Sequence, residues 1–118
     1  MWPFRRASQT AAPNPPTVDV REAWSRARKG ARLVDVRSER EFAQGHPKGA
    51  RNVPPARIKA GDVGLATDDE ILVICLSGHR SPQQARRLAA MGYANVNNVG
   101  GGLLAWKRAG LPVKGARC

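Results

Sequence analysis

The stretch that decides the fold is Ile71-Leu72-Val73-Ile74-Cys75, which is followed by Leu76-Ser77-Gly78-His79-Arg80 and then by Ser81-Pro82-Gln83-Gln84. A run that is apolar at every position is typical of a central parallel strand covered by helices on both faces. Ser, Pro and Gln at the cap, first and third positions predict that a helix begins at Ser81, with Ser81 as its N-cap. The sequence therefore predicts a strand, a short loop and a helix, with Cys75 at the end of the strand.

Short apolar runs and helical patterns alternate along the rest of the chain, as they do in α/β domains. Further strands are predicted at residues 33–36, 52–53 and 94–99, and helices at residues 20–29 and 103–109. A short helix is also predicted between Ser38 and Gly45, where it ends. Asp19 with Glu22, and Ser38 with Glu41, have the spacing of helix-capping pairs. The fold class predicted from these patterns is α/β.

Length and composition narrow the class of protein further. The chain has 118 residues, which suits one small domain, and 42% of them are hydrophobic, which is enough for a core. No apolar run approaches the roughly 20 residues that span a bilayer, so we expect no membrane insertion. The formal charge of +11 suits nucleic acid, an anionic membrane surface, small anions or plain solvation. No nucleic-acid-binding motif accompanies the charge, so we predict no nucleic-acid partner.

The two cysteines, Cys75 and Cys118, lie far apart in the sequence. Neither belongs to a cluster with metal-ligand spacing, so we expect no structural metal. The basic start of the chain is not followed by the apolar run of a secretory signal, which favours the cytoplasm. We predict a flexible Pro-rich extension at residues 1–16, a domain at 17–114 and a tail at 115–118. Cys118 is either an incidental terminal residue or a relay thiol.

The place of Cys75 in this scheme predicts a reactive thiolate. Ligands of open α/β sheets bind outside the carboxyl ends of the strands. The amide groups of the loop and of the first helical turn form a positive concavity there, Gly78 lets the backbone curl tightly, and Arg80 adds a positive charge. Such surroundings can lower a cysteine pKa from about 8.5 to about 3.5–7.5. The alternative is a buried cysteine that only fills space at a strand end.

The length of the loop distinguishes two kinds of thiolate chemistry. Phosphatases of the cysteine type need five residues between Cys and Arg in order to wrap a phosphoryl group. Here four residues separate Cys75 from Arg80, and Ser81 stands where the phosphatase arginine would be. The shorter loop suits a single sulfur atom on the cysteine better than a phosphoryl group.

Three motifs in order resemble the rhodanese-type sulfurtransferases, and together they cover residues 17–114. The stretch from Cys75 to Ser81 resembles the active-site loop of that family. The matches to its N-terminal signature are Asp35-Val36-Arg37, Glu41-Phe42, Gly45-His46, Gly49-Ala50 and Asn52-Val53-Pro54. The matches to its C-terminal signature are Gly101-Gly102, Trp106, Gly110 and Pro112-Val113.

The resemblance implies a three-layer α/β domain with a parallel sheet of about five strands and helices on both faces. It also implies that Cys75 takes a sulfane sulfur from a small anionic donor such as thiosulfate and holds it as a persulfide. The acceptor would be cyanide, a thiol or a sulfur carrier, and no metal or organic cofactor is needed. The residues predicted to bind substrate are Leu76, Ser77, Gly78, His79, Arg80 and Arg37.

Several side chains keep two interpretations at this stage. Arg37 suits either an ion pair or an oxyanion. Asp35 and His46 are expected to have structural roles, and His79 either helps to bind an anionic donor or points to solvent. A rhodanese-like module that binds a partner without catalysis is the alternative to the enzyme, although an intact Cys75 favours chemistry.

Overall fold

Five parallel strands form the central sheet of the protein, in the order β1-β6-β5-β2-β4. Their bounds are β1 Thr17–Val18, β2 Arg32–Asp35, β4 Arg51–Asn52, β5 Glu70–Ile74 and β6 Asn95–Val99. The computed structural model describes residues 14–115, so Cys118 and most of the predicted extension and tail lie outside the described residues. The number of strands and their parallel direction agree with the predicted sheet.

The apolar run of β5 lies at the centre of the sheet, as predicted, with β2 on one side and β6 on the other. Its side chains alternate between the two faces because successive residues of a strand point in opposite directions. Leu72 and Ile74 belong to one core cluster, and Ile71, Val73 and Cys75 belong to the other. Both faces are therefore buried from Ile71 onwards, which explains why every residue of the strand after Glu70 is apolar.

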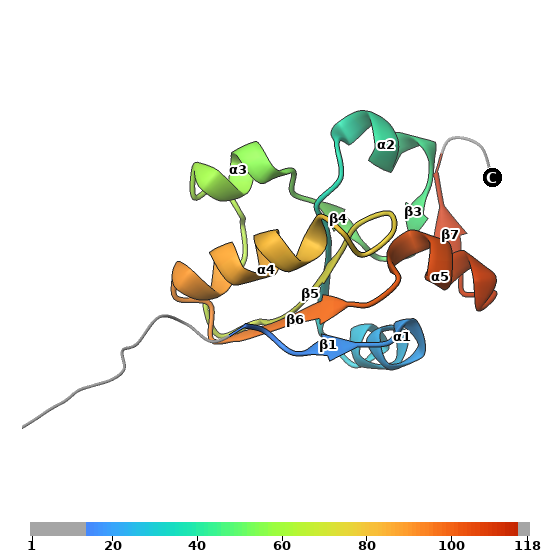
Figure 1. Cartoon of the computed structure of the whole chain (residues 1–118), viewed down its shortest axis with the longest axis horizontal. Coiled ribbons are helices and arrows are strands. Elements are labelled where there is room, and N and C mark those ends of the chain that lie inside the picture. The colour runs from blue at the N-terminus through green and yellow to red at the C-terminus, as the bar shows by residue number, and fades with distance from the viewer. Residues whose placement is uncertain (1–13, 116–118) are drawn as a thin grey trace, which may run out of the picture.

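Helices cover both faces of the sheet and make the domain three-layered (Figure 1). The helices are α1 Val20–Arg28, α2 Glu39–Gln44, α3 Pro55–Lys59, α4 Ser81–Ala90 and α5 Gly102–Arg108. α1 and α5 pack on one face, where the fully buried Trp106 meets Trp24 edge to face at 5.8 Å. α3 and α4 cover the opposite face.

The predicted caps of two helices are confirmed, and that of a third is wrong. The Asp19 side chain accepts from the amide of Glu22 at 2.8 Å, and Ser38 forms a reciprocal capping box with Glu41. In α4, however, the N-cap is Arg80, and Ser81 is already the first helical residue. The hydroxyl of Ser81 faces the sulfur of Cys75 instead of capping its own helix.

A second, two-stranded sheet lies outside the predicted elements. β3 (His46–Pro47) pairs antiparallel with β7 (Val113–Lys114), which ties the end of the domain to the segment after α2. Neither strand has enough residues to show a pattern in the sequence. Within residues 14–115, no helix is both long and apolar enough to cross a membrane.

Candidate active site

Cys75 lies where the central strand ends and the loop to α4 begins. It is 1% exposed, and its position is the carboxyl edge of the parallel sheet, as predicted. The loop rests on α5, because the amides of Leu103 and Leu104 donate to the carbonyls of Cys75 and Leu76 at 2.8 and 3.0 Å. The backbone of Cys75 is therefore held both by the strand β5 that it follows and by the hydrogen bonds from α5.

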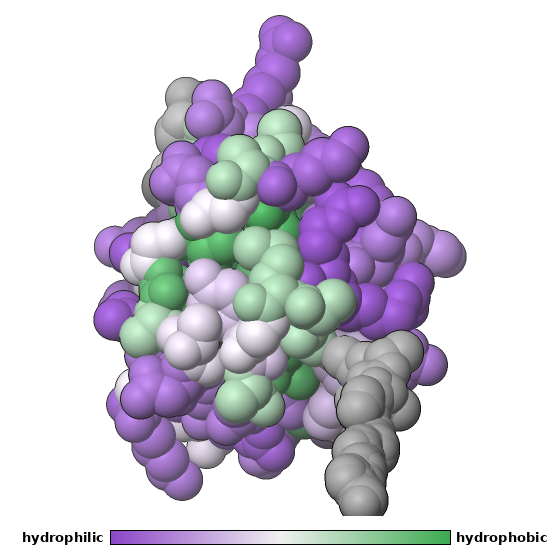
Figure 2. Space-filling model, turned by 90° about the vertical axis from the view of Figure 1, so that its left-hand side faces the viewer, coloured by the Kyte–Doolittle hydropathy of each residue, from purple (hydrophilic) through white to green (hydrophobic). Residues whose placement is uncertain are grey.

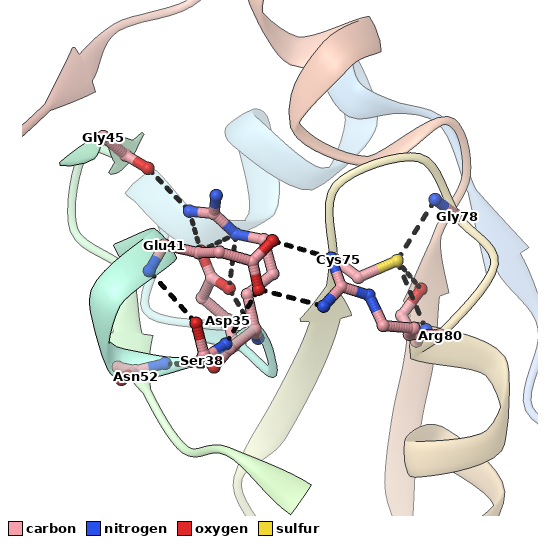
Figure 3. A network of polar contacts seen from close by, with 10 residues as sticks. Asp35, Ser38, Glu41, Gly45, Asn52, Cys75, Gly78 and Arg80 are labelled. Carbon is pink, nitrogen blue, oxygen red and sulfur yellow. Dashed lines mark hydrogen bonds and ion pairs between the residues drawn. The ribbon is translucent and has the colours of Figure 1, made fainter. Parts of the chain in front are cut away.

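The sulfur of Cys75 is surrounded by hydrogen-bond donors (Figure 3). The backbone N–H groups of Gly78 and Ser81 donate to Sγ at 3.1 and 3.3 Å. Ser81 Oγ lies 3.4 Å away, close enough to accept from the thiol or to donate to the thiolate. Gly78 has φ +93°, and a Cβ there would stand 3.1 Å from the amide nitrogen of Gly101. Glycine is therefore required for the curl that aims these amides at the sulfur.

Two opposing effects set the pKa of Cys75. Burial raises it, whereas the Ser81 hydroxyl and the backbone N–H groups of Ser81, Arg80 and Gly78 stabilise the thiolate. The hydrogen bonds outweigh burial, so the pKa of Cys75 lies below its ordinary value. A lower pKa means that a larger fraction of the sulfur is ionised near neutral pH, and the thiolate is the nucleophilic form of cysteine.

Arg80 turns from the loop to α2, where its guanidinium makes two hydrogen bonds to Glu41, at 2.9 and 3.0 Å (Figure 3). This contact lowers the pKa of Glu41 from about 4.5 to about 2, and it raises the pKa of Arg80. The sequence assigned Glu41 to the capping box, in which it takes part, and to the family signature, but predicted no contact with Arg80. The positive charge predicted at the end of the loop is therefore present but paired.

Arg37 and Asp35 form a buried ion pair beside the loop. The Arg37 side chain is 4% exposed, and its Nη2 lies 2.8 Å from Asp35 Oδ2 and 2.6 Å from the carbonyl oxygen of Gly45. Asn52 fixes the same segment by donating to the carbonyls of Asp35 and Arg37. The structural role predicted for Asp35 is confirmed.

A hollow of about 310 Å³ opens between the loop, α2 and α5. It is lined by Arg37, Glu41, Gln44, Leu76, Leu103 and Lys107, among others. Two predicted substrate-binding residues, Arg37 and Leu76, thus share one space. Among residues 14–115, no three His, Cys, Asp or Glu side chains come together as metal ligands.

The sequence model of the rhodanese-like domain matches residues 12–109 of the chain. The chain belongs to the rhodanese-like domain family. The match covers all five strands of the parallel sheet, the loop after Cys75 and helix α5.

Several relatives of this rhodanese-like domain are named as sulfurtransferases. Thiosulfate sulfurtransferase 18 of Arabidopsis thaliana is 36% identical over 91% of this chain and 89% of its own length. Thiosulfate sulfurtransferase GlpE of Haemophilus influenzae is 37% identical over 81% of this chain and 91% of its own. The solution structure of the rhodanese-like domain of the Anabaena Alr3790 protein has a TM-score of 0.78 at 27% identity, covering 86% of this chain and 80% of that one.

The two histidines of the rhodanese-like domain have different surroundings. The ring of His46 stacks on Phe42 at 3.7 Å, and its Nδ1 lies 2.8 Å from the carbonyl oxygen of Phe42, so its predicted structural role is confirmed. His79 is exposed, and its Nδ1 lies 2.7 Å from Ser77 Oγ. Neither imidazole has a hydrogen bond to Cys75 among the contacts of the described residues.

Proposed function

We propose that this chain is a sulfurtransferase that carries sulfane sulfur as a persulfide on Cys75. One observation carries the proposal: a buried sulfur that accepts two backbone N–H bonds and faces the hydroxyl of Ser81. Donors placed in this way stabilise a sulfur anion, whether it is the thiolate or the outer sulfur of a persulfide. The sulfurtransferase names of the relatives support the same chemistry.

In the first step, the Cys75 thiolate attacks the outer sulfur of thiosulfate. A new S–S bond forms on Cys75, the S–S bond of thiosulfate breaks, and sulfite leaves with the bonding electrons. In the second step, cyanide or a thiolate attacks the outer sulfur of the persulfide, and Cys75 leaves as a thiolate. The cycle needs no proton transfer to the cysteine, which fits a site where, in the described part of the chain, neither imidazole is hydrogen-bonded to the sulfur.

The other predicted residues support these steps from the loop. Ser77, Gly78, His79 and Arg80 form the loop between Cys75 and α4, and Leu76 with Arg37 lines the hollow next to that loop. We take residues 17–114 as the catalytic unit. A reducing compartment such as the cytoplasm would keep Cys75 as the free thiol that the first step requires.

The test is to incubate the protein with thiosulfate and measure the intact mass, expecting one added sulfur atom. Fragment masses should place that sulfur on Cys75, and added cyanide should remove it and release thiocyanate. Cys75→Ser should give neither signal, whereas Cys118→Ser should give both. Absence of the adduct with thiosulfate and with other sulfane donors would favour the partner-binding module, and a phosphatase assay would check the excluded chemistry.

A further inference from the structure

The hollow beside Cys75 has a charge balance that follows from its ion pairs. Arg37 is neutralised by Asp35, and Glu41 by Arg80, each through more than one hydrogen bond. These pairs leave Lys107, which has no ion pair with any residue in the range 14–115. The hollow therefore carries one uncompensated positive charge.

The position of Lys107 is fixed by helix α5. Lys107 follows Leu103 by four residues, so both side chains lie on one face of the helix, and both line the hollow. The amide of Leu103 donates to the carbonyl of Cys75, which couples this face of the helix directly to the reactive residue. The next residue, Arg108, is also exposed but does not line the hollow.

The remaining walls favour an organic ligand over a bare inorganic ion. Leu76 and Leu103 supply apolar surface next to the loop, and Gln44 adds a polar amide. The volume of about 310 Å³ lies at the small end of the range for small-molecule sites. A molecule with a short carbon chain between a thiol and an anionic group would fit the small volume of the hollow. Its chain would match the leucines, and its anionic group would match the positive charge of Lys107.

Resting on the proposed function, we propose that this hollow binds the acceptor, a low-molecular-weight thiol that carries a carboxylate, and that Lys107 binds the carboxylate. The carbon chain lies against Leu76 and Leu103, and the thiolate faces the loop. The thiolate attacks the outer sulfur of the Cys75 persulfide, a new S–S bond forms on the acceptor, and Cys75 leaves as a thiolate. The acceptor thus becomes a persulfide, and no external oxidant or reductant is needed.

The experiment varies one acceptor at a time against saturating thiosulfate. The probes are 3-mercaptopropionate, which has the carboxylate, and 2-mercaptoethanol, which lacks it. The variant is Lys107→Met, and the matched control is Arg108→Met, which removes the same charge from the same helix outside the hollow. We expect Lys107→Met to lower the preference for 3-mercaptopropionate, as the ratio of the two kcat/KM values, about tenfold, in line with a lost charged hydrogen bond.

The loss should fall on the KM for 3-mercaptopropionate and not on kcat, because Lys107 binds a group remote from the reacting sulfur. Added salt should lower kcat/KM for this acceptor in the wild type more than in Lys107→Met. Equal preference ratios in Lys107→Met and Arg108→Met would overturn the proposal. A rise in the KM for thiosulfate that matches the rise for 3-mercaptopropionate would also overturn it, since Lys107 would then serve the donor.

A binding measurement separates this proposal from the proposed function. 3-(Methylthio)propionate has the same carboxylate and carbon chain but no reactive thiol. Its binding should shift the amide NMR signals of Leu76 and Leu103 and should weaken several-fold in Lys107→Met only. Absence of the persulfide adduct from every variant would refute the sulfurtransferase proposal, whereas unaltered binding of this probe by Lys107→Met would refute the role of Lys107.

Discussion

The two ends of the parallel sheet carry hollows of similar volume and opposite character. The hollow beside Cys75 measures about 310 Å³ and is lined by charged and polar side chains together with leucines. One of the hollows at the other end measures about 340 Å³, and the described residues that line it, which include Pro15, Pro16, Ala89 and Tyr93, carry no charge. Figure 2 shows apolar side chains gathered on that end of the molecule, with hydrophilic ones around them.

The comparison shows that a site of this kind depends on where hydrogen-bond donors converge, not on the space available. At the carboxyl ends of the strands, the loop after β5 turns its N–H groups towards Cys75. At the amino end, the backbone groups are used in turns, such as the bond from the Ala94 amide to the carbonyl of Thr67. An apolar hollow without converging donors offers contact area but no stabilisation of a sulfur anion.

The largest expected effect is that of Cys75→Ser. It should abolish thiocyanate formation, because the serine hydroxyl is not ionised at neutral pH and cannot hold a persulfide. The matched change at the other hollow, Tyr93→Phe, removes only the phenol hydroxyl that donates to the carbonyl of Leu65 at 3.3 Å. It should leave turnover within about twofold. Comparable losses in both variants, measured by the thiosulfate–cyanide assay, would contradict the functional difference between the two ends.

The second effect is a loss of stability, compared between one glycine at each end of the parallel sheet. Gly102 has φ +61°, and an added Cβ would lie 2.5–2.6 Å from the carbonyl oxygens of Leu76 and Cys75. Gly92 has φ +105°, with no atom within 4 Å of such a Cβ. Gly92→Ala should therefore cost only backbone strain, about 1–2 kcal/mol. Gly102→Ala should cost more, about 3 kcal/mol or above, because α5 must also move away from the loop.

Urea unfolding of the two glycine variants measures this difference. Gly102→Ala should also slow sulfur transfer, since the carbonyls it displaces belong to the residues that carry and flank the thiol. An equal loss of unfolding free energy in both variants would mean that α5 does not anchor the loop.

The third effect tests the hydrogen bonds to the sulfur of Cys75 with two serines, one that contacts the sulfur and one that does not. Ser81→Ala removes the hydroxyl 3.4 Å from Sγ, while Ser77→Ala removes one that contacts His79 instead. Loss of a donor to the thiolate should raise the pKa of Cys75, because the ionised sulfur then has one hydrogen bond fewer. Since a raised pKa leaves less thiolate, the pH profile of iodoacetamide alkylation should move to higher pH in Ser81→Ala. An equal displacement in Ser77→Ala would show that the contact with the sulfur is not the cause.

Local patterns were sufficient to predict the centre of the fold and the position of Cys75 at the end of its strand. The unbroken apolar run predicts a strand buried on both faces, and the spacing of Ser38 and Glu41 predicts a helix start, because both depend on neighbouring residues. The strands β1, β3, β4 and β7 have two residues each, too few to show any period, and of these four the sequence predicted only β4, at residues 52–53. The other three exist because partner strands are nearby, which no local pattern records.

The polar contacts of the site also depend on partners that are distant in the sequence, which local patterns do not record. Glu41 reaches Arg80 across 39 positions of sequence, so its second role depends on how the loop and α2 meet in the folded chain. Ser81 has the residue type and position of an N-cap, but its hydroxyl lies against Cys75, and tertiary contact prevails over local preference. Local sequence predicts which residues are reactive, while the partners that adjust their charge come from tertiary structure.

The smallest effect concerns the ion pair that links the loop to α2. Glu41→Gln removes the charge but keeps an amide that can still complete the capping box with Ser38. Because Glu41 and Arg80 are 33% and 47% exposed, solvent screening limits the expected loss of unfolding free energy to about 1 kcal/mol. Asp62→Asn, at the more exposed pair with Arg57, should cost less than about 0.5 kcal/mol.

The pH dependence of unfolding isolates the contribution of Glu41. Its pKa is about 2 in the folded chain against an ordinary value of about 4.5, so the folded state holds the carboxylate and binds fewer protons there. The stabilisation is fully present above about pH 4.5 and is lost as the pH falls towards 2. Over that interval the unfolding free energy of the wild type should fall more steeply than that of Glu41→Gln. Parallel curves would mean that the ion pair adds no stability and that the caps of α2 and the contacts of α5 hold the loop without it.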